Sequence, residues 1–192
     1  MTNSLVLGSA SPRRADLLRQ IGLSFDVITS DVDETLLPGE DPSTYCKRIA
    51  HDKARDVASR CEGRVIIGAD TVVVIDGGIL GKPADESEAR SMLEKLSGRT
   101  HTVITGVSVL ERVTGECETF SVTSHVTFRT MNPEEIDRYI ATGEPIGKAG
   151  AYAIQGKGAV FVRWISGSYS NIMGLPIYET ALALSRFGVR AV

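Results

Sequence analysis

The sequence of 192 residues has few of the residues that build disulfide frameworks or metal centres. Its three cysteines lie far apart and form no C-x-x-C pair, which argues against a disulfide framework or a thiolate zinc site. Its three histidines stand in unrelated contexts without metal-ligand spacing, so we expect no histidine-based site. This cysteine usage fits a reducing compartment, and we predict a cytoplasmic location.

The chain also lacks a basic excess and long apolar runs. Its formal net charge of −3 offers no general attraction to nucleic acid, so any anion must bind at a local cluster. No apolar run approaches the roughly 20 residues that span a membrane. The N-terminal stretch MTNSLVLGSA has no basic segment and does not read as a signal peptide. We therefore expect neither a nucleic-acid partner nor a membrane partner.

Internal repeats, low-complexity tracts and proline-rich linkers are absent as well, so we predict one domain over residues 1–192. The apolar patterns and capping residues predict both strands and helices. Strands are expected near 4–8, after 25, within 64–80 with a turn at 76–78, as a hairpin of 101–111 with 117–129, and at 159–165. Helices are expected near 12–21, 42–60, 85–98, 132–143 and 176–187. This mixture indicates an α/β fold whose sheet is mixed and not purely parallel.

The stretch GSASPRRADLLRQIG, residues 8–22, places two arginines where a strand runs into a helix. A helix N-terminus attracts anions through its free N–H groups and its dipole. Arg13 and Arg14 would add forked donors that suit phosphate oxygens, and Gly8 would let a phosphate approach the backbone. The alternative is a serine-capped helix with solvated arginines. The P-loop pattern G-x-x-x-x-G-K-[ST] is missing.

Two lysines are candidates for the same site. Lys53 falls in a row with Ile49 and Val57 on the helix expected at 42–60, so it either reaches out to solvent or points into a cleft. Lys82 lies between Gly81 and a proline in a tight loop, and its position alone indicates little.

Asp70 stands between the apolar runs VIIGA and TVVV, where burying a carboxylate is costly without a partner. Binding a metal, accepting a proton or pairing with a lysine would each explain it; a strand-end aspartate bonded to its own backbone is the alternative. Glu34, in the acidic stretch DVDET, could supply a second carboxylate or could simply be solvated. Two carboxylates would suffice for Mg²⁺ together with waters and a triphosphate.

The stretch GEPIGKAGAYAIQGKG, residues 143–158, has five glycines around Tyr152 and Gln155. We interpret it as an irregular loop that could close over a ligand, with the amide of Gln155 able to bind the edge of a base. An ordinary glycine-rich connection is the alternative.

Taken together, SASPRR, ADTVV followed by GKP, KAGAYAIQG and GSYSNIMGLPIYET resemble the Maf family of nucleoside triphosphate pyrophosphatases. The resemblance covers nearly the whole chain, in the family's order. It implies a two-lobed α/β domain, with a mixed sheet flanked by helices and a substrate cleft between the lobes. It implies metal-dependent hydrolysis of a nucleoside triphosphate to the monophosphate and pyrophosphate, with Mg²⁺ or Mn²⁺, and a homodimer. KAGAYAIQG resembles the branch that acts on dTTP and UTP.

The resemblance also implies roles for single residues. Glu34 and Asp70 would serve the metal and the attacking water, with Asp70 as proton acceptor. The phosphates would meet Ser11, Arg13 and Arg14, and their charge would be neutralised by Lys53 and Lys82. Base preference would depend on Arg13, Thr71 and Gln155.

One position departs from that branch, which usually carries an aspartate before the lysine of KAGAY, where this chain has Gly147. Any metal-binding or loop-ordering role at that position is therefore in question here. Two alternative functions stay open at this point. One is a nucleotide-binding regulator of cell division and septum formation with weak hydrolysis, and the other is a pyrophosphatase for 7-methyl-GTP.

Overall fold

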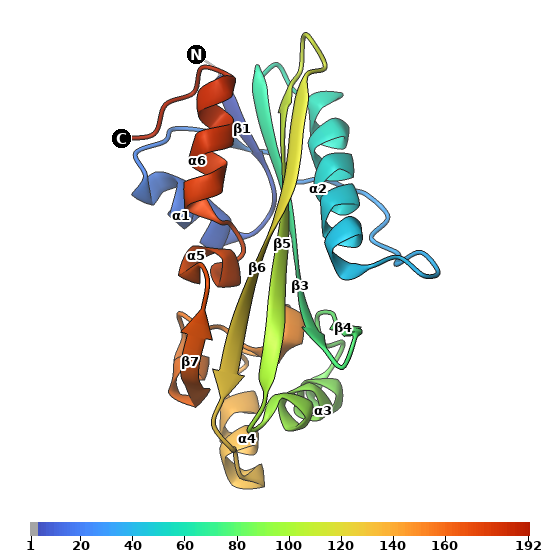
Figure 1. Cartoon of the computed structure of the whole chain (residues 1–192), viewed down its shortest axis with the longest axis vertical. Coiled ribbons are helices and arrows are strands. Elements are labelled where there is room, and N and C mark those ends of the chain that lie inside the picture. Colours follow the sequence, from blue (N-terminus) through green and yellow to red (C-terminus); the bar gives the residue numbers. More distant parts are fainter. Residues whose placement is uncertain (1–3) are drawn as a thin grey trace. The chain divides into compact units, whose positions relative to one another are not determined.

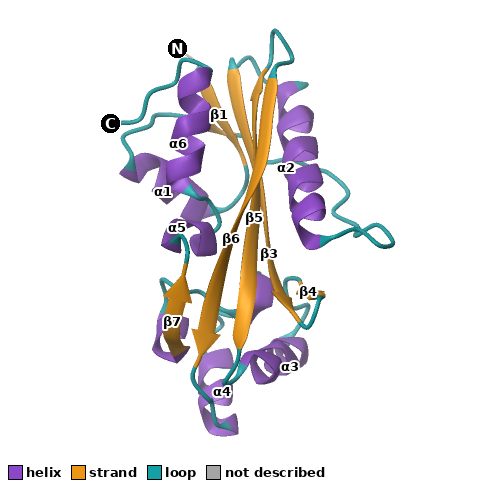
Figure 2. Cartoon of the chain, in the orientation of Figure 1, coloured by secondary structure: helices purple, strands orange, loops and turns teal. Residues whose placement is uncertain are grey.

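The computed structural model describes residues 4–192, which form both helices and strands (Figures 1 and 2). The strands are β1 Leu5–Gly8, β2 Asp26–Val27, β3 Val65–Ile75, β4 Gly78–Leu80, β5 Thr100–Glu111, β6 Cys117–Phe128 and β7 Val162–Ser166. The α-helices are α1 Pro12–Gln20, α2 Pro42–Ala58, α3 Glu86–Leu96, α4 Pro133–Ile140, α5 Tyr169–Met173 and α6 Ile177–Arg186. Two 3₁₀ helices complete the elements, η1 Ala149–Ala151 and η2 Lys157–Phe161.

The strands form one seven-stranded sheet in the order β2-β1-β3-β5-β6-β7, with β4 paired to β3. Strand β1 runs parallel to β2 and to β3, whereas β3 with β4 and β6 with β7 are antiparallel. The α/β class and the mixed sheet that the sequence predicts are therefore confirmed. In the described part of the chain, 4–192, no helix has the length and apolarity to cross a membrane.

The chain divides into two compact units. Of the described residues, the first unit contains 4–70, 105–122 and 174–192, and the second contains 71–104 and 123–173. Strands β3, β5 and β6 each contribute one part to either unit. Each unit has a hydrophobic cluster of its own.

In the first unit, helix α2 lies very close to the sheet because two strand positions are glycine. A Cβ atom on Gly68 of β3 would stand 2.1 Å from the carbonyl oxygen of Ala50, and one on Gly106 of β5 would stand 2.3 Å from Cys46. Figure 1 draws α2 on one side of these strands, with α1 and α6 on the other. The short distance between α2 and β3 decides how far a side chain must reach between them.

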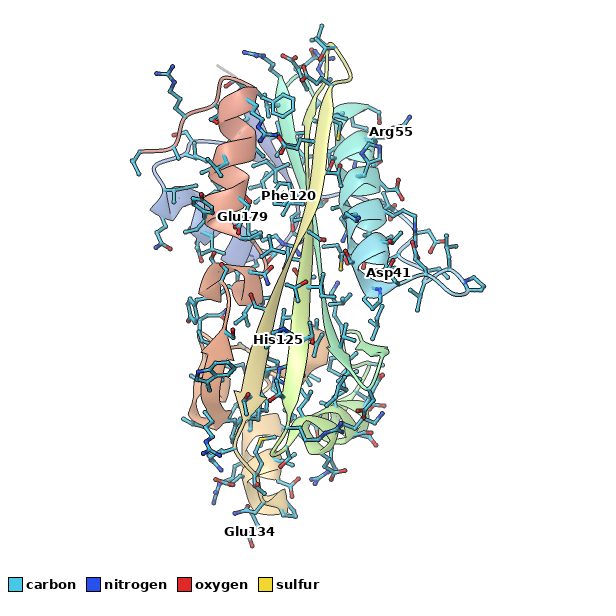
Figure 3. All side chains as sticks on the ribbon, viewed as in Figure 1. Asp41, Arg55, Phe120, His125, Glu134 and Glu179 are labelled. Carbon is cyan, nitrogen blue, oxygen red and sulfur yellow. The ribbon has the colours of Figure 1, made fainter. Side chains whose placement is uncertain are left out.

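Helix α2 begins where the sequence predicts. The side chain of Asp41, labelled in Figure 3, accepts hydrogen bonds from the backbone N–H groups of Ser43 and Thr44, at 3.0 and 3.2 Å. Pro42 follows in the first turn, where its missing N–H costs nothing.

The second unit has an aromatic core. The rings of His101, Phe128 and Tyr152 pack edge to face, with centroids 4.8 to 5.4 Å apart. The Nε2 atom of His101 lies 2.8 Å from the hydroxyl of Tyr152. Burial lowers the pKa of His101 to about 4, so this histidine is neutral in the core.

Two predicted strands are shorter than expected. The strand after residue 25 has only two residues, because its polar continuation leaves the sheet as a loop up to Glu40. The strand predicted at 159–165 begins at Val162, because the residues before it form η2. The hairpin of β5 with β6 is confirmed: the N–H of Glu111 donates to the carbonyl of Glu116 at 2.8 Å.

Candidate active site

The first unit holds a cluster of a buried lysine, a buried aspartate and a more exposed glutamate. The Nζ atom of Lys53 lies 2.8 Å from Oδ1 of Asp70 and 2.8 Å from Oε1 of Glu34. Lys53 and Asp70 are each only 7% exposed, whereas the side chain of Glu34 is 41% exposed. The structure thus brings together three residues that the sequence selects separately, and it opens their cluster to solvent on the side of Glu34.

Helix α2 directs Lys53 inward. Its row-mates Ile49 and Val57 are fully buried, so Lys53 lies on the apolar face of the helix. Because Gly68 lets the helix lie against β3, the lysine reaches Asp70, two residues further along that strand. Lys53 therefore points inward and does not reach out to solvent.

The loop that carries Glu34 is fixed from the same helix. The hydroxyl of Tyr45 donates a hydrogen bond to the backbone carbonyl of Glu34, at 2.8 Å. Burial, together with the charges of Asp70 and Glu34, raises the pKa of Tyr45, so its hydroxyl stays a donor. Arg48, one turn further on, donates to the carbonyl of Thr35 at 3.0 Å. Two side chains of α2 therefore hold the acidic loop beside Lys53.

The start of α1 presents a buried arginine. Arg14 is 9% exposed; its Nε donates to the carbonyl of Gly174 at 2.8 Å, and one terminal nitrogen donates to the hydroxyl of Ser9 at 3.0 Å. Burial lowers the pKa of Arg14, while the nearby charges of Asp70 and Glu34 act in the opposite direction. A guanidinium is still a cation under such conditions, so positive charge lies near the carboxylates.

The other two residues predicted at this helix start are more accessible. Arg13 is partly exposed, and partial burial lowers its pKa. Ser11 is the N-cap of α1, yet its side chain makes no capping hydrogen bond, while its N–H donates to the hydroxyl of Ser9 at 3.2 Å. The serine-capped helix with solvated arginines is therefore wrong for this chain, because Ser11 does not cap with its side chain and Arg14 is buried.

The remaining candidates, Thr71, Lys82 and Gln155, belong to the second unit. Thr71 is partly buried on β3 beside Asp70, while Lys82 and Gln155 are exposed in loops. The N–H of Gly150 donates to the carbonyl of Gly81 at 3.0 Å, which ties the loop of Lys82 to the glycine-rich segment. The roles of these three residues stay predictions.

Among residues 4–192, no group of three or more histidine, cysteine, aspartate or glutamate side chains could hold a metal ion. Glu34 and Asp70 form a pair of carboxylates. Oε1 of Glu34 and Oδ1 of Asp70 each lie 2.8 Å from the same atom, the Nζ of Lys53.

Sequence reasoning missed three residues with clear structural roles here: Ser9, Tyr45 and Glu144. Ser9 accepts hydrogen bonds from both Ser11 and Arg14. The position of Tyr45, two helical turns before Lys53 on the same apolar face, was a signal that could have identified it. Glu144, in the second unit, carries no comparable signal, because its contacts are with the hydroxyl of Tyr139 and with backbone groups of a loop.

Comparison with known proteins agrees with the motifs. A family described as Maf-like protein matches residues 4–187. A dTTP/UTP pyrophosphatase of Syntrophotalea carbinolica is 52% identical over 188 residues, covering 97% of this chain and 86% of that protein. Another, from Geotalea uraniireducens, is 50% identical, covering 97% and 96%. A solved protein from Vibrio cholerae covers 97% of this chain and 95% of its own, with 12% identity and a TM-score of 0.45. With the family match covering nearly all described residues and relatives at half identity, the chain belongs to the Maf family.

Proposed function

We propose that this protein hydrolyses nucleoside triphosphates, dTTP and UTP above all, to the monophosphate and pyrophosphate. The observation that carries the proposal is the cluster in which the buried Lys53 joins Glu34 and Asp70, with Arg14 close by. The relatives at about half identity are named for this activity. Nucleotide pools of the cytoplasm are the setting in which such an activity removes unwanted triphosphates.

Cleaving the bond between the α and β phosphates requires that the charge on the phosphate oxygens be neutralised. The start of α1 supports this role, since its first N–H groups, its dipole end and the guanidinium of Arg14 all favour an anion. Ser11 fits as a further donor, because its hydroxyl is not used as a helix cap. Arg13 and Lys82, both accessible to solvent, add cationic side chains that can move onto a bound triphosphate.

The cluster also provides for the attacking water. Asp70, held at one oxygen by Lys53, is the proton acceptor that we assign to the water attacking the α phosphorus. Before substrate binds, Lys53 holds that carboxylate in place and offsets part of its charge. Pyrophosphate then leaves, and the proton ends on Asp70.

Glu34 and Asp70 fit a divalent cation, because their carboxylates converge on one cationic position, which the ammonium of Lys53 occupies in this structure. The side of Glu34 opens to solvent. Mg²⁺ takes few protein carboxylates and completes its shell with waters and phosphate oxygens. A cation bound there would lower the pKa of its bound water and neutralise phosphate charge. We propose that these two side chains hold it, and that Lys53 shifts toward the phosphates when they do.

Base preference rests on Gln155 in this proposal. Its amide can donate to O4 of uracil or thymine and accept from N3–H, whereas cytosine presents the reverse pattern. The methyl group that distinguishes thymine is worth only about 1–3 kcal/mol in an apolar pocket, so one site could accept both bases.

The test is to incubate the purified protein with UTP and Mg²⁺ or Mn²⁺ and to separate the products by chromatography. We expect UMP and pyrophosphate, with no turnover once EDTA is added. The appearance of UDP and orthophosphate would refute the proposal. Tight nucleotide binding without turnover of any triphosphate would favour a regulatory role instead.

A further inference from the structure

The glycine-rich segment 143–158 is organised around one carboxylate, that of Glu144. Its Oε1 accepts hydrogen bonds from the hydroxyl of Tyr139 at 2.8 Å and from the N–H of Gly158 at 2.9 Å. Its Oε2 accepts from the N–H of Lys157 at 3.0 Å. Successive backbone N–H groups that converge on an anion form a nest, and here the chain fills the nest with its own side chain.

The glycines of the stretch QGKG follow from this arrangement. A Cβ atom on Gly156 would stand 2.3 Å from Oε2 of Glu144. One on Gly158 would stand 2.7 Å from the hydroxyl of Tyr139 and 3.0 Å from the carbonyl oxygen of Ala153. Both positions therefore need a residue without a side chain so that the carboxylate and the hydroxyl can approach the backbone.

The same two side chains hold the segment on both sides of Gln155. On one side, the N–H of Ala153 donates to the hydroxyl of Tyr139 at 3.2 Å. On the other side, Lys157 and Gly158 are bonded to Glu144. Gln155, itself exposed, thus lies within the short segment 153–158, and both ends of this segment are hydrogen-bonded to the same Tyr139–Glu144 pair.

The carboxyl group of Glu144 is stabilised in its ionised form. Burial raises its pKa, but the hydrogen bonds from Lys157, Gly158 and Tyr139 outweigh that effect and the net pKa is lowered. Lys148, whose ammonium donates to the backbone carbonyl of Glu144 at 2.6 Å, adds a cation nearby. An anionic acceptor makes these hydrogen bonds stronger than neutral ones, so the segment 153–158 is held firmly.

We propose that Glu144 is a positioning residue that fixes Gln155 for binding the base of the substrate. This inference rests on the proposed function. The inference also gives Glu144 the role of ordering this loop, because Gly147 has no side chain that could do so. A free glutamine can rotate its amide to suit cytosine, so discrimination requires a rigid support. The role concerns the base and not the bond that is cleaved.

The experiment compares Glu144→Ala, Glu144→Gln and Tyr139→Phe with a matched control, Glu135→Ala. Glu135 lies on α4 of the same unit and is equally well bonded, to Arg129 and to the N–H of Asn132, but it makes none of the contacts described around Gln155. The measurements are kcat and KM for UTP and CTP, the inhibition constant of inorganic tripolyphosphate, and hydrogen exchange at the amides of Lys157 and Gly158.

We expect Glu144→Ala to lower the preference for UTP over CTP by roughly 10-fold, mainly through KM for UTP, since it removes binding of the base and not of the transition state. Exchange at the two amides should accelerate, and tripolyphosphate, which has no base, should inhibit as before. Glu144→Gln and Tyr139→Phe should lie between wild type and Glu144→Ala, while Glu135→Ala should keep the wild-type preference.

Two results would overturn the role of Glu144. One is an unchanged preference in Glu144→Ala and Tyr139→Phe although wild type discriminates between the bases. The other is weaker inhibition by tripolyphosphate in parallel with the KM for UTP, which would mean a general structural defect. If Glu144→Ala does not fold, Glu144→Gln and Tyr139→Phe decide by the same criteria. Failure of wild type to cleave UTP would refute the proposed function itself, which separates the two failures.

Discussion

Two carboxylates, one in each unit, are stabilised in different ways. Asp70 in the first unit is bonded to the ammonium of Lys53, a side chain that shares its charge with a second carboxylate. Glu144 in the second unit is bonded to backbone N–H groups and a tyrosine hydroxyl. A lysine can move toward a substrate and give up its partner, whereas backbone donors of a closed loop cannot. The first arrangement suits chemistry and the second suits rigid recognition.

The buried titratable groups of the two units also differ, since those of the first unit are charged and that of the second is neutral. The first unit buries the cations Lys53 and Arg14 next to carboxylates, while the second buries His101 as a neutral ring among aromatic side chains. Removing one partner from the charged cluster leaves another charge without compensation, whereas the aromatic core resists any charge at all. Substitutions that exchange or remove these groups can therefore test the comparison.

The largest effect is expected for Asp70→Asn. This change keeps the shape of the side chain but removes its charge and its basicity, so kcat should fall by roughly 10²-fold or more, the scale for loss of a general base. Steady-state rates and thermal unfolding should be measured on the same preparation, with Asp16→Asn, an exposed carboxylate of α1, as control. A folded Asp70→Asn protein with nearly wild-type turnover would mean that Asp70 is not the base.

The aromatic core predicts an acid sensitivity. Because the pKa of His101 is lowered from 6.5 to about 4, the unfolded chain binds more protons between these two values. Stability from this group is complete above pH 6.5 and is lost as pH falls toward 4, by on the order of 3 kcal/mol. Urea unfolding at several pH values should show this slope in wild type and in His125→Gln. A slope of the same size in His101→Gln would contradict the assignment.

Arg14→Ala should have a somewhat smaller effect on catalysis. Loss of a charge-assisted phosphate contact costs about 1.5–3 kcal/mol, or roughly 10- to 150-fold in kcat/KM. Arg19→Ala, on the same helix but exposed and paired with Asp16, is the matched control and should change little. Equal kcat/KM values for the two variants would mean that Arg14 at the start of α1 has a structural role and does not bind phosphate.

The sequence predicts most of the elements and the residues of the first-unit cluster. Capping residues and apolar periodicity determine helices such as α2, and the row of Ile49 with Lys53 on α2 indicates an inward face. It could not predict that Lys53 would bridge both carboxylates, because Glu34 lies in a loop whose course depends on contacts with Tyr45 and Arg48. Glu144 escaped prediction for a similar reason, since the backbone groups that it binds come together only in the folded loop.

The smallest expected effect concerns Gln155→Ala. Because Gln155 is exposed and water can replace its amide, we expect the lost base contacts to cost about 0.5–1.5 kcal/mol in total, so the preference for UTP over CTP should fall by roughly 2- to 12-fold while kcat for UTP changes little. The measurement is kcat/KM for UTP, dTTP, CTP and GTP in wild type and variant. An unchanged ratio of UTP to CTP would place base recognition elsewhere, with backbone groups near Thr71 as the next candidates. A wild type that prefers GTP or its 7-methyl form would contradict the assigned branch.

The most direct test of the central claim is to hydrolyse UTP in water enriched in ¹⁸O and to locate the label by mass spectrometry. If Asp70 directs water to the α phosphorus, one ¹⁸O atom is found in UMP and none in pyrophosphate. Label in pyrophosphate would mean attack at the β phosphorus, and UDP with labelled orthophosphate would mean attack at the γ phosphorus. Either result would contradict the account of the site given by Lys53, Glu34 and Asp70.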